Sequence, residues 1–330
     1  MKDIKVIFMG TPDFSVNVLN SLIDNTNVIG VVTQPDKLAG RKQVLTQPAV
    51  KKVALENNIK VIQPTKIREE YQSIIDLNPD IIITCAYGQF LPKEILDYPK
   101  YGCINVHASL LPKLRGGAPI HKAIIDGYTT TGITIMYMGL KMDNGDIISQ
   151  KSIEIEKTDN VGTLHDKLSL LGAELLIETL PSIVSGQANR IVQNEEEITF
   201  AYNISREDEH LNFNKTKVEV FNQIRGLNPW PVSYAILEDK EIKIYEAIIG
   251  EGIYKEKLNG EIVKLYKDGI GIKVSDGEII LKIIKPSGSK KMNVKDYLNG
   301  FKEKSNLIGK VFRWVMSSSL FHLTLQNKYF

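Results

Sequence analysis

Hydrophobic residues in the first half of the chain alternate between short continuous runs and helical spacing. The apolar run Ile4–Met9 ends in Gly10-Thr11-Pro12, and Val16, Leu19 and Leu22 follow at helical spacing. Continuous runs of this length are typical of buried strands, whereas spacings of three or four residues indicate one face of a helix. Similar runs predict further strands at 28–33, 61–63, 81–86, 103–107 and 133–137. This alternation favours an α/β domain with a doubly wound, mostly parallel sheet.

Between these strands the sequence predicts loops and helices. A loop is expected from Gln34 to about Gln47, and a helix from Pro48 to Asn57. Thr158 and Asp159 can cap a further helix, because leucines recur after them at 164, 168, 171 and 175.

The pattern changes near residue 190. Residues 191–207 include the polar segments that begin at Asn194 and Asn203, and are interpreted as a linker. A helical pattern at about Thr216–Arg225 is then followed by short alternating segments at 233–237, 242–249, 260–266, 271–274 and 278–285. Short strands separated by Gly- and Asp-containing turns predict a small antiparallel β-barrel, OB-like in type. The expected domains are therefore 1–190 and 208–312, with an extension at 313–330 to which no role is assigned.

Composition adds constraints on location and partners. A chain of 330 residues with 43% hydrophobic and 24% charged residues is ordinary for a two-domain globular protein. It has neither a membrane-spanning apolar run nor a signal-peptide pattern, so a cytoplasmic location is expected. Cys85 and Cys103 lie in apolar runs and are predicted to be buried, reduced thiols. With a net charge of only +2, any contact with RNA must come from a local patch.

The first strand-to-helix turn, Gly10–Ser15, lacks the second and third glycines of the G-x-G-x-x-G dinucleotide motif. A nicotinamide or flavin dehydrogenase is therefore disfavoured.

The densest chemical signal is Asn105 with His107, at the end of the predicted strand 103–107. Residues two apart in a strand point to the same face, and open α/β sheets place ligands at the carboxyl ends of their strands. Asn can donate to an oxyanion, and His can carry a proton near neutral pH. On spacing alone, the pair is equally consistent with a polar cap on the following turn.

A third candidate is Asp143, within the segment Lys141–Ile148. A carboxylate after a strand could orient His107 or take a proton from an attacking amine. An ordinary Asx turn is the alternative. A calcium loop is disfavoured, because the EF-hand spacing is absent.

Taken together, these motifs resemble the folate-dependent formyltransferases, and within them the branch that formylates methionyl initiator tRNA. The resemblance runs from about Ile4 to Phe312 and rests on N-x-H-x-S-L-L-P, followed by D-x-G-D-I-I. Further matching segments are Gly10–Phe14, Thr33–Asp36, Ala39–Arg41, Ala86–Gly88, Arg115–Ile120, Thr131–Met136 and Arg225–Pro231.

The resemblance implies direct transfer of a formyl group from 10-formyltetrahydrofolate to the α-amine of methionyl initiator tRNA. Neither a metal nor a covalent enzyme intermediate is implied, and a monomer is expected. Asn105 would donate to the formyl oxygen as it becomes an oxyanion, and His107 would stabilise that charge and help protonate the leaving nitrogen. Asp143 would orient His107 and receive the amine proton.

The resemblance also implies binding residues. For tetrahydrofolate they are Ser109, Leu110, Leu111 and Pro112, with Tyr87, Gln89, Phe90 and Leu91 lining a pterin pocket. For tRNA they are Arg41, in a loop where Leu38, Gln43 and Val44 replace a usual proline and two lysines, and Arg206.

The sequence is also consistent with two other hypotheses about function. One is a formyltransferase of the same chemistry that acts on a small amine, such as glycinamide ribonucleotide or a nucleotide-linked amino sugar. The other is a folate- or RNA-binding protein without catalysis, which would not need Asn105, His107 and Asp143 together.

Overall fold

The computed structural model describes residues 1–39 and 43–314. The chain forms two compact units. The first contains residues 1–123, 129–156 and 163–203, and the second contains 124–128, 157–162 and the chain from 204 onward. Helices α6 (Pro119–Ile125) and α7 (Val161–Val184) include residues of both.

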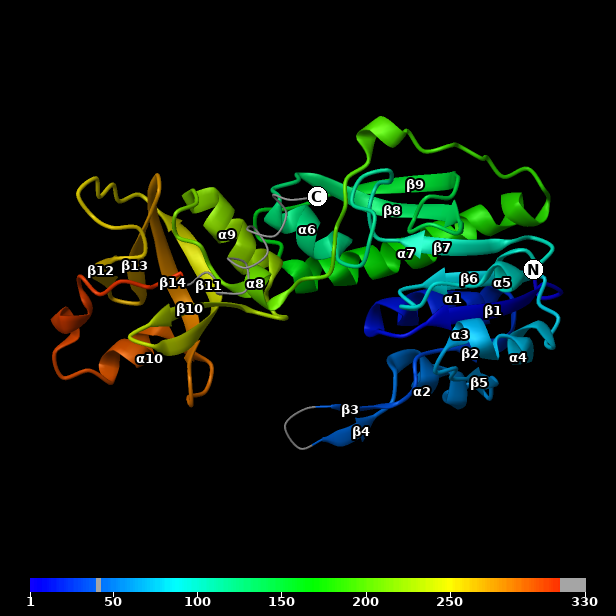
Figure 1. Ribbon diagram of the computed structural model, residues 1–330, viewed down its shortest axis with the longest axis horizontal. Coiled ribbons are helices and arrows are strands. Elements are labelled where there is room, and N and C mark those ends of the chain that lie inside the picture. Colours follow the sequence, from blue (N-terminus) through cyan, green and yellow to red (C-terminus); the bar gives the residue numbers. More distant parts are fainter. Residues whose placement is uncertain (40–42, 315–330) are drawn as a thin grey trace, which may run out of the picture. The chain divides into compact units, whose positions relative to one another are not determined.

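The first unit is built on a seven-stranded sheet in the order β5-β2-β1-β6-β7-β8-β9 (Figure 1). The first five strands of this order are parallel, β8 pairs antiparallel with β7, and β9 pairs antiparallel with β8. The bounds are β1 (Lys5–Gly10), β2 (Asn27–Val32), β5 (Val61–Ile62), β6 (Ile81–Cys85), β7 (Cys103–His107), β8 (Thr130–Tyr137) and β9 (Ile147–Glu154). The mostly parallel sheet is confirmed, and β9 is a strand that was not expected from the sequence.

Helices cover both faces of this sheet, as expected for a doubly wound fold. On one face Ile7 and Met9 pack with buried residues of α3 (Ile67–Glu70), α4 (Gln72–Ile75) and α5 (Lys93–Leu96). On the other, α7 lies so close to β7 that a Cβ on Gly172 would be 3.0 Å from Val106. There α1 (Val16–Asn25) joins α7 through a hydrogen bond from Asn17 to Ser169, and α2 (Ala49–Glu56) lies beside α1.

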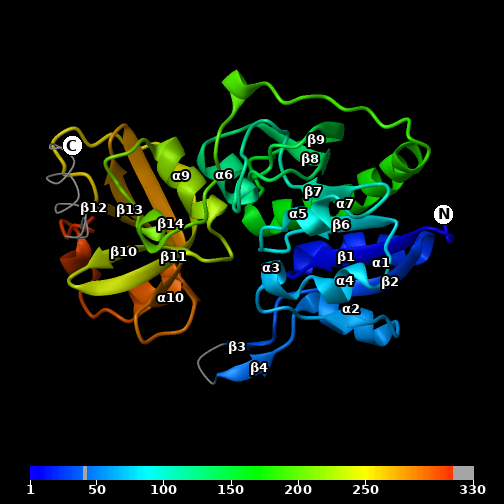
Figure 2. The same ribbon diagram turned by 45° about the vertical axis from the view of Figure 1, so that its right-hand side comes forward.

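Residues 34–47, expected as a loop, contain a short antiparallel hairpin of β3 (Lys37–Ala39) and β4 (Val44–Thr46). The hairpin projects away from the sheet of its unit (Figures 1 and 2). Leu38, Val44 and Leu45 are all more than half exposed on it. Arg41, the predicted tRNA-contacting residue, lies between the two strands and outside the described residues.

The second unit confirms the predicted antiparallel strands. They pair in the order β10-β11-β14-β13-β12, with β15 added to β14. Their bounds are β10 (Ser233–Leu237), β11 (Lys240–Gly250), β12 (Ile262–Tyr266), β13 (Gly269–Val274), β14 (Gly277–Pro286) and β15 (Met292–Asn293). The core beneath them includes buried residues of α9 (Lys217–Gly226) and of α10 (Val294–Asn299). Helix α10 was not expected.

Two helices of the second unit begin at capping residues. Thr216 accepts from the backbone of Glu219, and the Glu219 carboxylate accepts in return from the backbone of Thr216. Such a capping box satisfies two amide groups that a helix start leaves unpaired. Ser205 and Asp208 repeat the arrangement at the start of α8 (Arg206–Glu209).

Both cysteines are buried free thiols, as predicted. Burial raises the pKa of Cys85 to about 12, so this group is an uncharged thiol at neutral pH. None of the helices in the described part of the chain has the length and apolar character needed to cross a membrane.

Candidate active site

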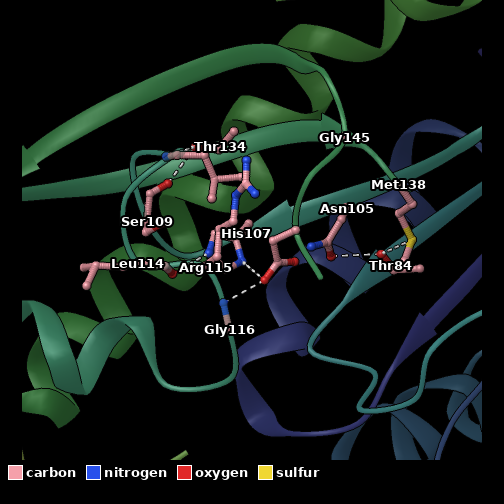
Figure 3. Close-up of polar contacts among 12 residues, drawn as sticks. Thr84, Asn105, His107, Ser109, Leu114, Arg115, Gly116, Thr134, Met138 and Gly145 are labelled. Carbon is pink, nitrogen blue, oxygen red and sulfur yellow. Dashed lines mark hydrogen bonds and ion pairs between the residues drawn. The ribbon is translucent and has the colours of Figure 1, made fainter. Parts of the chain in front are cut away.

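Asn105 and His107 lie at the carboxyl end of β7, which runs between β6 and β8 in the middle of the sheet. The Asn105 amide is oriented by Thr84 of β6, whose hydroxyl donates to Asn105 Oδ1 at 2.8 Å (Figure 3). Thr84 is itself buried, and Met138 Sδ lies 3.2 Å from its hydroxyl oxygen. Because Oδ1 accepts from Thr84, Nδ2 is the donor that the amide can offer to a substrate. No sequence motif singled out Thr84.

Replacing Thr84 with valine removes this hydrogen bond but keeps the shape of the side chain. We expect kcat for the reaction of this site to fall about three- to tenfold, the equivalent of one hydrogen bond. Steady-state kinetics would measure it. The matched control is Thr131→Val on β8, since the Thr131 hydroxyl is buried and has no hydrogen-bond partner in the described part of the chain. Equal kinetics for both variants would mean that Thr84 does not orient Asn105.

His107 is almost fully buried, and its two ring nitrogens have different surroundings. Nε2 lies 3.1 Å from the backbone oxygen of Leu114. A carbonyl only accepts hydrogen bonds, so Nε2 carries a proton, and Nδ1 is the nitrogen that can exchange one with the site. Nδ1 lies 3.7 Å from Asp143 Oδ2 (Figure 3). The carbonyl of Leu114 therefore fixes the ring, a contact that no motif in the sequence predicts.

Asp143 lies on the connection between β8 and β9, in a backbone conformation that residues with a side chain rarely adopt, with φ of 48°. Its Oδ2 accepts a hydrogen bond of 2.8 Å from the backbone of Gly116 (Figure 3). The carboxylate is thus held from one side by an amide and faces the imidazole on the other. The structure brings Asn105, His107 and Asp143 into one site.

The turn Ser109–Pro112 follows β7 directly and is held by Thr134 of β8. The Thr134 hydroxyl donates to the Ser109 carbonyl at 2.7 Å and accepts from the amide of Leu111 at 3.1 Å (Figure 3). Gln150 of β9 donates to the Leu111 carbonyl and to the Thr134 hydroxyl. This segment therefore has a fixed shape next to His107.

The four residues expected to line a pterin pocket have different surroundings. Tyr87 and Leu91 belong to the buried core of the first unit, whereas Phe90 is 54% exposed. The Gln89 side chain accepts from the backbone of Ile67. The Tyr87 hydroxyl is buried without a hydrogen-bond partner among the described residues, and burial raises the pKa of this group.

Arg206 lies in the second unit and is engaged by acidic neighbours. It forms ion pairs with Glu209 and Glu241, and its guanidinium lies 3.7 Å from the centre of the Tyr234 ring. Most of its charge is therefore compensated within its own unit.

Two family models match the chain. The model described as formyl transferase matches residues 2–180, and the model of the formyl transferase C-terminal domain matches residues 203–302. The chain belongs to the formyl transferase family. The first model includes Asn105, His107 and Asp143 of this formyl transferase. Residues 181–202, which contain Gln193, lie between the two matched ranges.

Curated relatives resemble this formyl transferase over nearly its whole length. A methionyl-tRNA formyltransferase of Staphylococcus aureus (strain MW2) is 53% identical over 311 residues, which cover 93% of this chain and 98% of the relative. A methionyl-tRNA formyltransferase of Bacillus licheniformis is 52% identical over 300 residues, or 90% of this chain and 95% of the relative.

Solved structures share the fold of this formyl transferase. An N-formyltransferase of Helicobacter canadensis, solved with folinic acid and dTDP-3-aminofucose, has a TM-score of 0.63 at 21% identity, covering 84% of this chain and 98% of its own. HypX of Aquifex aeolicus, solved with tetrahydrofolic acid, has a TM-score of 0.60 at 14% identity, covering 93% and 50%.

Proposed function

We propose that this formyl transferase moves the formyl group of 10-formyltetrahydrofolate to the α-amine of the methionine on initiator tRNA, in the cytoplasm and as a monomer. The observation that supports this acceptor most strongly is the 53% identity to a methionyl-tRNA formyltransferase over 93% of the chain, which extends well into the second unit. An enzyme that formylates a small amine would not need to be so similar to a methionyl-tRNA formyltransferase over both units.

The geometry of the site suits attack of an amine on a formyl carbon. As the amine nitrogen bonds to that carbon, negative charge develops on the formyl oxygen, and Asn105 Nδ2 donates to it. The bond to the folate nitrogen then breaks, and this nitrogen takes a proton from Nδ1 of His107, which is protonated on both ring nitrogens at this point. Asp143 accepts the proton that the amine loses, directly or through water, and passes it to Nδ1, 3.7 Å from its Oδ2, so that His107 regains the proton it gave. Only a neutral amine can attack, so transfer declines as the pH falls.

For the folate, we assign the turn formed by Ser109, Leu110, Leu111 and Pro112, with Tyr87, Gln89, Phe90 and Leu91 nearby in the same unit. The Tyr87 hydroxyl supports this assignment: it is buried with no hydrogen-bond partner in the described ranges 1–39 and 43–314, and such a polar atom is costly unless a ligand or water satisfies it. A mostly apolar set of side chains with backbone polar groups beside it suits a flat heterocycle.

For the tRNA, we assign Arg41, which lies in the sequence between β3 and β4, and Arg206. The hairpin's projection from its unit supports a contact with a large partner. Arg206 has the weaker support of the two, because Glu209 and Glu241 already compensate its charge.

The acceptor is tested by competition between substrates. The protein is mixed with 10-formyltetrahydrofolate and with methionyl initiator tRNA, a nucleotide-linked amino sugar or glycinamide ribonucleotide, and the formylated product is identified by mass. Formylation of the tRNA alone supports the proposal. Preferential formylation of a small amine would replace it, and binding of folate without any transfer would favour the non-catalytic reading.

Salt gives an independent prediction. If the acceptor is an RNA, its affinity should fall about tenfold or more between about 50 and 200 mM salt, because Lys and Arg contacts to phosphates displace counterions. The KM for methionyl-tRNA at several salt concentrations measures this, and the KM for 10-formyltetrahydrofolate in the same series is the control. A flat response for the tRNA would contradict a phosphate-binding surface.

A further inference from the structure

Gln193 lies in the segment 191–207 that the sequence predicts to be a linker. Its side chain is buried, and both of its polar atoms form hydrogen bonds. Gln193 Oε1 accepts two hydrogen bonds from Arg115, at 3.0 Å from Nε and 2.8 Å from Nη2. Its Nε2 donates to the backbone oxygens of Asp143 and Gly145, both at 2.8 Å. One carboxamide therefore connects a buried arginine to the loop that bears Asp143.

Arg115 determines which way this amide faces. A guanidinium keeps its proton at any ordinary pH and can only donate, so it requires the oxygen of the amide and turns Nε2 toward the loop. Arg115 is 5% exposed, and the carboxamide offers an acceptor and two donors without adding charge. Neither a carboxylate nor an apolar side chain could both accept from Arg115 and donate to the loop carbonyls.

The loop that bears Asp143 needs such support, because its backbone conformation is intrinsically unfavourable. Asp143 has a positive φ of 48°, which is unfavourable for a residue with a Cβ. Gly145 lies so close to the preceding strand that a Cβ there would be 1.8 Å from the Tyr137 oxygen. The two hydrogen bonds from Gln193 hold the carbonyls on either side of Asn144, and so fix the turn.

Arg115 and the residue after it also hold the side chain of Asp143. Gly116, next to Arg115, donates its amide to Asp143 Oδ2, and the backbone of Arg115 pairs with Thr199 and Ala201. The carboxylate is thereby held 3.7 Å from His107 Nδ1. A shift of the Asp143 backbone would change that distance without removing any reacting group.

We propose that Gln193 is a positioning residue for formyl transfer, and that with Arg115 it acts on the reaction by holding the Asp143 loop in place. This inference rests on the proposed formyl transfer. It gives residues 191–203 a part in the chemistry, although neither family model covers Gln193.

Two substitutions test the role. Gln193→Glu keeps the size of the side chain but turns an oxygen toward the two loop carbonyls, and Gln193→Met removes all four hydrogen bonds. We expect either to lower kcat by roughly 10²-fold, the effect of a displacement of about 1 Å at a reacting group, while the KM values change little. The matched control is Gln187→Glu, an exposed position six residues earlier, which should keep wild-type kinetics. Circular dichroism and the melting temperature establish that each variant is folded at the assay temperature.

A double-mutant cycle with Asp143 separates positioning from general structural damage. If Gln193 acts through Asp143, Gln193→Met should cost less than about threefold in an Asp143→Asn background, because groups that act as one unit are not additive. The same loss of activity in both backgrounds, or a kcat within twofold of wild type for both single variants, would overturn the inference. Failure of the unsubstituted protein to formylate any amine would instead overturn the proposed function.

Discussion

Asp143→Asn is expected to lower kcat for formyl transfer by roughly 10²–10⁴-fold, the range for loss of a positioned general base. Asparagine has nearly the same shape, and its side-chain oxygen can still accept from the Gly116 amide that now binds Oδ2. It cannot accept a proton from the attacking amine, and it places no negative charge beside His107. The expected loss is therefore chemical, and single-turnover formylation at saturating substrates would measure it.

The control for this substitution is Asp24→Asn, at an exposed position on α1, which removes the same charge away from the site. It should leave kcat unchanged. A kcat for Asp143→Asn within tenfold of wild type would show that the amine proton leaves by another route, and His107 Nδ1 would then be the nearest group described here that could accept it.

Asn105→Ala is expected to lower kcat by roughly 10²–10³-fold, as for removal of one oxyanion donor, with little change in either KM. The effect falls on kcat because the formyl oxygen acquires its charge only as the amine attacks. Asn105→Asp is a useful partner variant, since it still accepts from Thr84 but offers no N–H to the formyl oxygen.

Both Asn105 variants should lose activity to a similar extent. Activity within twofold of wild type in Asn105→Ala would remove the assigned role. A large loss in Asn105→Ala with a small loss in Asn105→Asp would show that Asn105 fills space next to Thr84 and does not donate to the oxyanion.

The sequence predicted those parts of the fold that rest on apolar patterning. Ile81–Cys85 and Cys103–His107 are nearly continuous apolar runs, and both are central strands. Strand β9 was missed because only Ile147 and Ile148 are buried, while the rest of Ile147–Glu154 is intermediate or exposed. The hairpin of β3 and β4 was missed for a related reason: its strands have three residues each, and those of β4 are all exposed.

The same limit applies to the site. Spacing alone placed Asn105 and His107 on one face of a strand, which the structure shows. It could not bring Asp143 to them, because that depends on the antiparallel pairing of β8 with β9 and on a positive φ at Asp143 itself. Thr84 and Gln193 contact the site through polar side-chain hydrogen bonds, which leave no periodic pattern in a sequence.

The packing of residues 191–203 determines where the chain can be divided. A shortened protein that ended at residue 190, where the polarity changes, would lose the acceptor for the buried Arg115 guanidinium and the Thr199 oxygen that pairs with its backbone. Each buried polar group left unpaired costs about 1–3 kcal/mol, and Ala201, fully buried, would be lost as well. An independently expressed first unit should therefore extend through Asn203.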